Sequence, residues 1–194
     1  MMSPLVLTPR FEAALVYATK LHRHQRRKVN AVPYASHLLG VAALVLEDGG
    51  TEEEAIAALF HDAIEDQGGI KTLIALRDCF GDRVAAIALG CTEPAAADYA
   101  SWIRHKQAYL QQLRRADPSV QRVALADKLH NGWSLLRNLA EAGDATWQAF
   151  TGSPSEILWF YQEAASCFET MKPGWMATEL TQVVQRLMEQ ADLL

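Results

Sequence analysis

Apolar residues recur along this chain about every three to four positions, the spacing expected for the buried face of an amphipathic α-helix. In the first such segment the apolar stripe follows Thr8-Pro9, an N-cap residue with proline at the first helical position, and continues to about Arg23. The alternating apolar and polar positions typical of β-strands are almost absent. The pattern therefore predicts an all-α protein.

Capping and turn residues divide this pattern into separate helices. Gly49-Gly50 ends one helix, and Thr51 and Ser153 each open a capping box with a glutamate three residues later. Together these features predict helices over residues 9–23, 34–47, 52–67, 71–79, 82–90, 98–116, 119–140, 154–171 and 178–191. No repeat or long linker interrupts them. We expect one domain over residues 1–194, a helical bundle of about eight to ten helices.

Composition narrows the classes of partner. The chain has 194 residues, 18 basic and 23 acidic side chains and a net charge of −5, and half of its residues are hydrophobic. Such a chain can bury a sizeable core, and an acidic chain is not expected to bind nucleic acid. We expect no membrane span and no signal peptide. Three cysteines without a CxxC motif predict reduced thiols in a cytoplasmic protein.

One short segment concentrates side chains that bind metals or transfer protons. The segment runs Phe60-His61-Asp62-Ala63-Ile64-Glu65-Asp66, directly after an apolar run. On a continuous helix His61 would lie one turn from Glu65, and Asp62 one turn from Asp66. Imidazole and carboxylate together suit a divalent metal ion. The alternative is a polar helix end whose charges face water.

Two more candidate ligands lie on other predicted helices. His37 interrupts an otherwise apolar helix, where a hydrogen-bonded core histidine is the alternative to a metal ligand. Asp127 directly follows an apolar run, and a buried carboxylate is costly unless it is paired or bound to a metal. Its alternative is a salt bridge to a lysine or arginine.

These positions resemble a known family. His37, His61-Asp62 and Asp127 are similar, in order and spacing, to the H…HD…D signature of HD-domain metal-dependent phosphohydrolases. Arg27-Lys28, the HDxxED motif at 61–66 and the run Ala126-Asp127-Lys128-Leu129-His130-Asn131 resemble the hydrolase domain of stringent-response (p)ppGpp synthetase/hydrolases. The resemblance covers about residues 10–170, with the helix at 178–191 beyond it, and points to a stand-alone small alarmone hydrolase.

The resemblance implies a role for each matching position. His37, His61, Asp62 and Asp127 would hold one divalent metal ion, with Mn²⁺ the expected cofactor. Glu65 and Asp66 would share the acid/base work, since one sequence cannot divide the roles of a coupled pair. The expected substrate contacts are Arg27, Lys28, Arg104, Lys106, Asn131 and Tyr161, although a basic helix face is otherwise a solvated surface. His130 is expected either to support a metal ligand or to have a structural role, rather than to ligate the metal, and His22, His24 and His105 are expected to lie at the surface.

The implied activity is hydrolysis of the 3′-pyrophosphate from guanosine 3′,5′-bis(diphosphate)-type nucleotides, which yields GDP or GTP and pyrophosphate. Two alternatives remain: the same chemistry on another phosphorylated nucleotide or small phosphoester, and a non-catalytic nucleotide-sensing domain. Val29, His105, Gly132-Trp133 and Thr151-Gly152-Ser153-Pro154 depart from the family pattern, all on the substrate side. The sequence leaves the oligomeric state open, with a homo-oligomer as one alternative.

Overall fold

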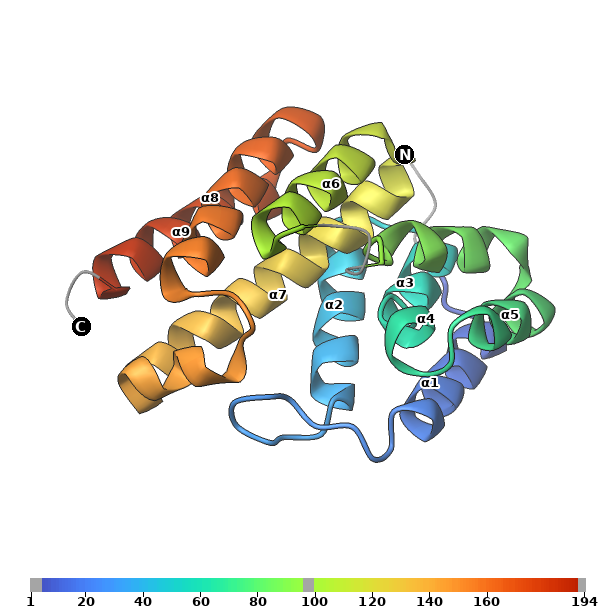
Figure 1. The fold of residues 1–194 in the computed structure, drawn as a ribbon. Coiled ribbons are helices and arrows are strands. Elements are labelled where there is room, and N and C mark those ends of the chain that lie inside the picture. The colour runs from blue at the N-terminus through green and yellow to red at the C-terminus, as the bar shows by residue number, and fades with distance from the viewer. Residues whose placement is uncertain (1–4, 96–99, 192–194) are drawn as a thin grey trace.

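A computed structural model describes residues 5–95 and 100–191 as a bundle of helices (Figure 1). The helices are α1 (Pro9–Leu21), α2 (Ala35–Glu47), α3 (Glu52–Leu59), α4 (Ala63–Asp66), α5 (Ile70–Cys91), α6 (Trp102–Arg115), α7 (Pro118–Ala142), α8 (Pro154–Met171) and α9 (Trp175–Ala191). A 3₁₀ helix, η2 (Gly143–Ala149), connects α7 to α8. The described ranges contain no β-strand, and their one isolated bridge pairs Arg26 with Pro33. The predicted all-α fold is confirmed.

The long helix α7 is the centre of the bundle. It packs against α2, α3, α5, α6, α8 and α9. In Figure 1 it runs diagonally through the molecule, with α6, α8 and α9 on one side and α1, α3, α4 and α5 on the other. One hydrophobic core cluster includes residues from α1 through α9. Within the described residues, no helix is both long enough and apolar enough to span a membrane.

The predicted helix starts follow from side-chain caps. Thr51 accepts a hydrogen bond from the Glu54 backbone N–H while the Glu54 side chain accepts one from Thr51, and Ser153 forms the same box with Glu156. Asp117 accepts from the Ser119 backbone N–H at the start of α7. Each cap satisfies backbone donors that the first helical turn leaves without partners. The capping boxes expected from the sequence are therefore present.

The segment around His61 differs from the prediction of one helix over 52–67. Helix α3 ends at Leu59, the backbone leaves helical geometry at Phe60, and α4 begins only at Ala63. The expectation that His61 and Glu65 share one helical face is therefore wrong. The break has a physical cause: the Phe60 side chain is fully buried, and the His61 ring turns back to the carbonyl of Ala58.

Other helix boundaries shift by smaller amounts. Gly81, at φ 82°, breaks α5 between the two helices predicted at 71–79 and 82–90. Glycine accommodates a positive φ at little cost because it has no Cβ, so the sequence favours a break at this position. Helix α9 begins at Trp175, earlier than the predicted 178. The first two residues of the helix predicted at 98–116 lie outside the described residues, and α6 begins at Trp102.

Candidate metal centre and adjoining cavity

Three buried side chains from three parts of the fold meet at one point. His37 comes from α2, His61 from the junction of α3 and α4, and Asp127 from the middle of α7. One ligand atom from each lies within 4.8 Å of the others. His37 Nε2 is 3.2 Å from His61 Nε2 and 3.1 Å from Asp127 Oδ1. The break before α4 makes this possible, because it turns the His61 ring into the core.

Asp62 lies beside this group. Its Oδ2 is 2.9 Å from His61 Nε2 and 3.6 Å from His37 Nε2. The Tyr34 hydroxyl donates to the same oxygen at 2.5 Å. Burial and the neighbouring Asp62 charge raise the pKa of Tyr34, so the hydroxyl keeps its proton and remains a donor. No role for Tyr34 was predicted from the sequence, although it lies only three residues before the candidate ligand His37.

The four side chains fit a divalent cation. His61 Nδ1 donates to the carbonyl oxygen of Ala58 at 2.8 Å, which directs Nε2 toward the group. Burial acts to lower the pKa of His61, but the charges of Asp62 and Asp127 outweigh it and raise that pKa well above its ordinary value. The site therefore attracts positive charge strongly. Two imidazole nitrogens and two carboxylates are a donor set that divalent transition metals accept.

Asp127 is held on both oxygens. Its Oδ2 accepts from Lys128 Nζ at 2.7 Å, and its Oδ1 accepts from Asn131 Nδ2 at 2.6 Å. Burial acts to raise the pKa of Asp127, but the Lys128 and His61 charges lower it well below its ordinary value. Asp127 is thus an ionised, oriented carboxylate. Lys128 is itself buried, with Nζ 5.0 Å from the centre of the Tyr109 ring.

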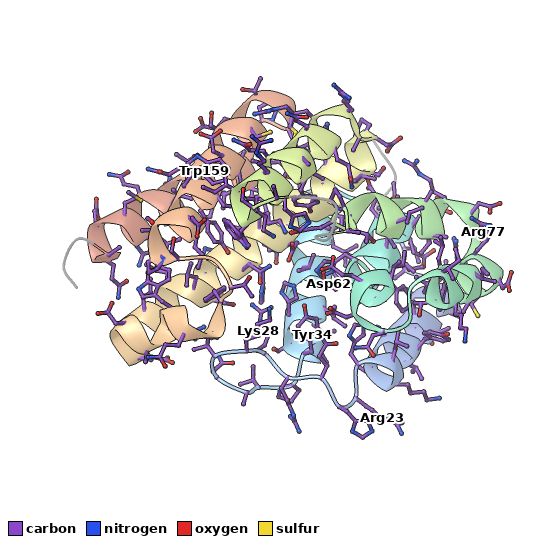
Figure 2. All side chains as sticks on the ribbon, in the orientation of Figure 1. Arg23, Lys28, Tyr34, Asp62, Arg77 and Trp159 are labelled. Carbon is purple, nitrogen blue, oxygen red and sulfur yellow. The ribbon has the colours of Figure 1, made fainter. Side chains whose placement is uncertain are left out.

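A cavity of about 350 Å³ opens beside these side chains. It collects most of the predicted site residues, namely Arg27, Lys28, Asp62, Glu65, Asp66, Lys106, Asp127, Asn131 and Tyr161. Trp102, Phe150 and Phe160 also line it and supply aromatic surface. In Figure 2 the labelled Lys28, Tyr34 and Asp62 gather in the middle of the molecule, whereas Arg77 lies at its edge. Arg104 is exposed and does not line this cavity.

The two candidate acid/base carboxylates have different surroundings. Partial desolvation beside the cavity and the charges of Glu93 and Asp62 raise the pKa of Glu65, although this residue remains solvent-exposed; its Oε2 also accepts from the Glu93 backbone N–H at 3.4 Å. Asp66 Oδ2 instead accepts from Gln25 Nε2 at 2.6 Å. Glu65 is therefore the better placed of the two to hold a proton, and Asp66 the more firmly oriented.

The basic side chains of the cavity are paired to different degrees. Arg27 donates to Asn131 Oδ1 at 2.7 Å and lies 5.7 Å from the centre of the Tyr34 ring. Lys106 Nζ is 2.7 and 2.6 Å from the two carboxylate oxygens of Glu93. Lys28 is exposed at the cavity wall. Glu93 was not predicted as a site residue, because its partner Lys106 lies 13 positions away on the next helix.

The prediction that His22 lies at the surface is wrong. His22 is only 2 % exposed, and its ring stacks on Tyr34 with 5.6 Å between ring centres. His22 Nδ1 and Gln25 Oε1 are 2.6 Å apart. The position of His22 at a helix end favoured a solvent-exposed side chain. In the structure, the loop that follows α1 folds back and covers the ring.

Comparison with known proteins identifies the scaffold. The HD domain family matches residues 14–155, a segment that contains all four side chains of the candidate metal centre. The chain belongs to the HD domain family. A crystal structure of a protein from Listeria monocytogenes EGD-e matches 79 % of this chain and 99 % of that protein, with 28 % identity and a TM-score of 0.68. A second structure, of a metazoan SpoT ortholog, has the same fold over 97 % of this chain, with a TM-score of 0.73 at 21 % identity.

Curated relatives of this HD domain protein carry enzymatic names. The guanosine-3′,5′-bis(diphosphate) 3′-pyrophosphohydrolase of Danio rerio is 35 % identical over 136 residues, which is 69 % of this chain and 71 % of that protein. The enzyme of the same name from Aquifex aeolicus is 34 % identical over 120 residues. The chain spans 17 % of the Aquifex protein and 16 % of a longer Synechocystis relative, so it matches one part of each.

Proposed function

We propose that this HD domain protein is a metal-dependent hydrolase that removes the 3′-pyrophosphate from guanosine 3′,5′-bis(diphosphate)-type nucleotides. The observation that carries the proposal is the convergence of His37, His61 and Asp127 beside a cavity whose wall includes Asp127, Glu65 and Asp66. The names of the Danio rerio and Aquifex aeolicus relatives supply the substrate class. The three free cysteines suit a reducing compartment, and we place the protein in the cytoplasm.

The proposed metal ligands are His37, His61, Asp62 and Asp127, and the proposed ion is Mn²⁺. Mixed nitrogen and oxygen donors support Mn²⁺ but bind other divalent transition ions as well. When bound, the ion would lower the pKa of a coordinated water and polarise a phosphoryl oxygen. Asn131 and Lys128 orient the Asp127 carboxylate, and Tyr34 orients Asp62.

Glu65 and Asp66 are the proposed groups for proton transfer. Hydrolysis joins the water oxygen to phosphorus, breaks the bond from phosphorus to the 3′ oxygen, and delivers a proton to that oxygen. The raised pKa of Glu65 suits a group that takes a proton from the water and returns it to the leaving oxygen. Asp66, held by Gln25, would orient the water. The two carboxylates act as a coupled pair, so both variants are expected to be impaired.

Arg27, Lys28, Asn131, Lys106 and Tyr161 are the proposed substrate contacts because they line the cavity. Arg27 can bind phosphate oxygens through two donors or stack on a purine base. Lys106 already pairs with Glu93, so a phosphate there would have to share or displace that carboxylate. Arg104 has the weakest support as a clamp for the leaving pyrophosphate, because it lies off the cavity.

The test is a substrate panel with product identification. Mn²⁺-loaded protein is incubated with ppGpp, pppGpp, GTP, GDP and guanosine 3′-monophosphate, and Glu65→Gln serves as the variant impaired in proton transfer. We expect GDP or GTP and pyrophosphate from the two 3′-pyrophosphates alone, with Glu65→Gln much slower. Hydrolysis confined to substrates without a 3′-pyrophosphate would contradict the proposed substrate and leave a different HD phosphohydrolase activity.

A further inference from the structure

His37 and His130 meet through their ring nitrogens on two different helices. The two Nδ1 atoms are 2.9 Å apart, and the ring centres are 4.9 Å apart. Two N–H groups cannot point at each other across a hydrogen bond, so one nitrogen donates and the other accepts. The assignment of donor and acceptor follows from what the other nitrogen of His37 does.

His37 Nε2 faces the candidate metal centre, 3.2 Å from His61 Nε2 and 3.1 Å from Asp127 Oδ1. A neutral imidazole that offers the Nε2 lone pair to a cation carries its proton on Nδ1. His37 Nδ1 is therefore the donor, and His130 Nδ1 is the acceptor. His130 in turn carries its proton on Nε2.

We propose that His130 is a positioning residue for His37: it accepts the Nδ1 proton and so fixes both the tautomer and the ring orientation that direct Nε2 to the metal. This inference rests on the metal centre of the proposed function. Metal-bound histidines usually donate their second N–H to a carboxylate, a backbone carbonyl or water. His61 follows that rule through Ala58, whereas His37 uses a side chain from another helix.

Gly40 provides the space that this contact needs. A Cβ atom at position 40 would lie 2.2 Å from His130 Cδ2 and 2.3 Å from its Nε2, far inside van der Waals contact. Gly40 lies one turn after His37 on α2, so the same face of that helix presents the ligand and admits the ring that supports it. Helix α7 thus supplies both a metal ligand, Asp127, and the support for the ligand on α2.

The test compares two replacements of His130 with opposite properties. His130→Phe keeps an aromatic ring but removes the acceptor. His130→Asn loses the ring but keeps an oxygen at about the position of Nδ1. We expect Mn²⁺ affinity to fall about 10–100-fold in His130→Phe, as for the loss of other hydrogen-bond partners of metal ligands, and to be largely retained in His130→Asn. Gly40→Ala should weaken binding in the same direction as His130→Phe.

The measurement is a titration of metal-stripped protein with Mn²⁺ alone, with free Mn²⁺ followed by electron paramagnetic resonance. His24→Phe is the control, since His24 is exposed and distant in sequence from every ligand. Wild-type affinity in His130→Phe, or a larger loss in His130→Asn than in His130→Phe, would overturn the positioning role and show a packing role instead. Absence of stoichiometric Mn²⁺ binding by the wild type would overturn the metal centre itself, and the positioning role with it.

Discussion

The metal end of the site (His37, His61, Asp62 and Asp127) and its basic end (Arg27, Lys28 and Lys106) are built differently. At the metal end, His37, His61 and Asp127 are at most 5 % exposed and contact one another directly. At the basic end, Arg27 and Lys106 pair with protein groups, and Lys28 is exposed. The metal end is therefore organised before any ligand arrives, whereas the basic end must exchange partners to bind phosphate. Under the proposed function, we infer that the buried contacts set the chemistry and that the exchangeable ones set the choice of substrate.

The largest expected effect is the loss of a metal ligand. Asp127→Asn keeps the shape and can still accept from Lys128, so the fold should persist while metal affinity drops. A bound metal supplies several kcal/mol of transition-state stabilisation, so we expect kcat/KM to fall by roughly 10³-fold or more. Steady-state kinetics and metal content check this. Asp117→Asn, the same change at the cap of the same helix, should leave both unchanged.

The second expected effect separates chemistry from metal binding. Glu65→Gln and Asp66→Asn should each lower kcat by roughly 10²-fold or more, because each removes a group that transfers or orients a proton. Metal content should stay at the wild-type level, since neither carboxylate is a proposed ligand. Single-turnover rates together with metal analysis distinguish the roles. A loss of metal from Glu65→Gln would move that residue into the ligand set.

The third prediction concerns the basic end. Arg27→Ala removes a charged donor worth about 1.5–3 kcal/mol, so KM should rise roughly 10–100-fold with a smaller change in kcat. Arg27→Lys keeps the charge but loses the planar fork, and should fall between wild type and alanine. The comparison is made on ppGpp and on a phosphoester without a base. If kcat falls more than KM rises, Arg27 belongs to the preorganised end of the cavity.

The smallest expected effect concerns fold stability, through the Arg83–Asp117 ion pair outside the site. Hydrogen bonds from Arg83 and the Ser119 backbone lower the pKa of Asp117 to about 2. The side chains of Arg83 and Asp117 are nonetheless both almost half exposed. A carboxyl with a lowered pKa stabilises the fold above its unfolded pKa of about 4 and loses that contribution as pH falls toward 2. Arg83→Gln should cost less than about 1 kcal/mol at pH 7 and a smaller amount near pH 2, where Asp117 is about half protonated. Urea unfolding at both pH values measures this.

Local signals predicted most of the helices, and the resemblance to a family pattern predicted which side chains form the buried His37–His61–Asp127 cluster. Capping boxes at Thr51 and Ser153 mark helix starts, and the spacing of His37, His61 and Asp127 repeats a family pattern. The break at Phe60 was missed because helical periodicity continues through it, and the burial that bends the chain there is a tertiary effect. Periodicity alone does not show where packing overrides propensity.

The side chains whose roles were not predicted from the sequence are hydrogen-bond partners of site residues that lie far away in the chain. Tyr34 reaches Asp62 across 28 positions, and Gln25 reaches Asp66 across 41. Such contacts depend on how α2, α4 and the loop before α2 pack, which no local pattern encodes. His130 was expected to support the site, and the structure adds that its contact is with His37.

The most direct test of the account is to follow metal occupancy and product in the same sample. Metal-stripped wild-type protein is titrated with Mn²⁺ in the presence of ppGpp, and bound Mn²⁺ and released pyrophosphate are both measured. The account predicts that pyrophosphate release rises in proportion to bound Mn²⁺ and stops rising at one ion per chain. Full turnover by the stripped protein, or saturation with Mn²⁺ and no pyrophosphate, would contradict it.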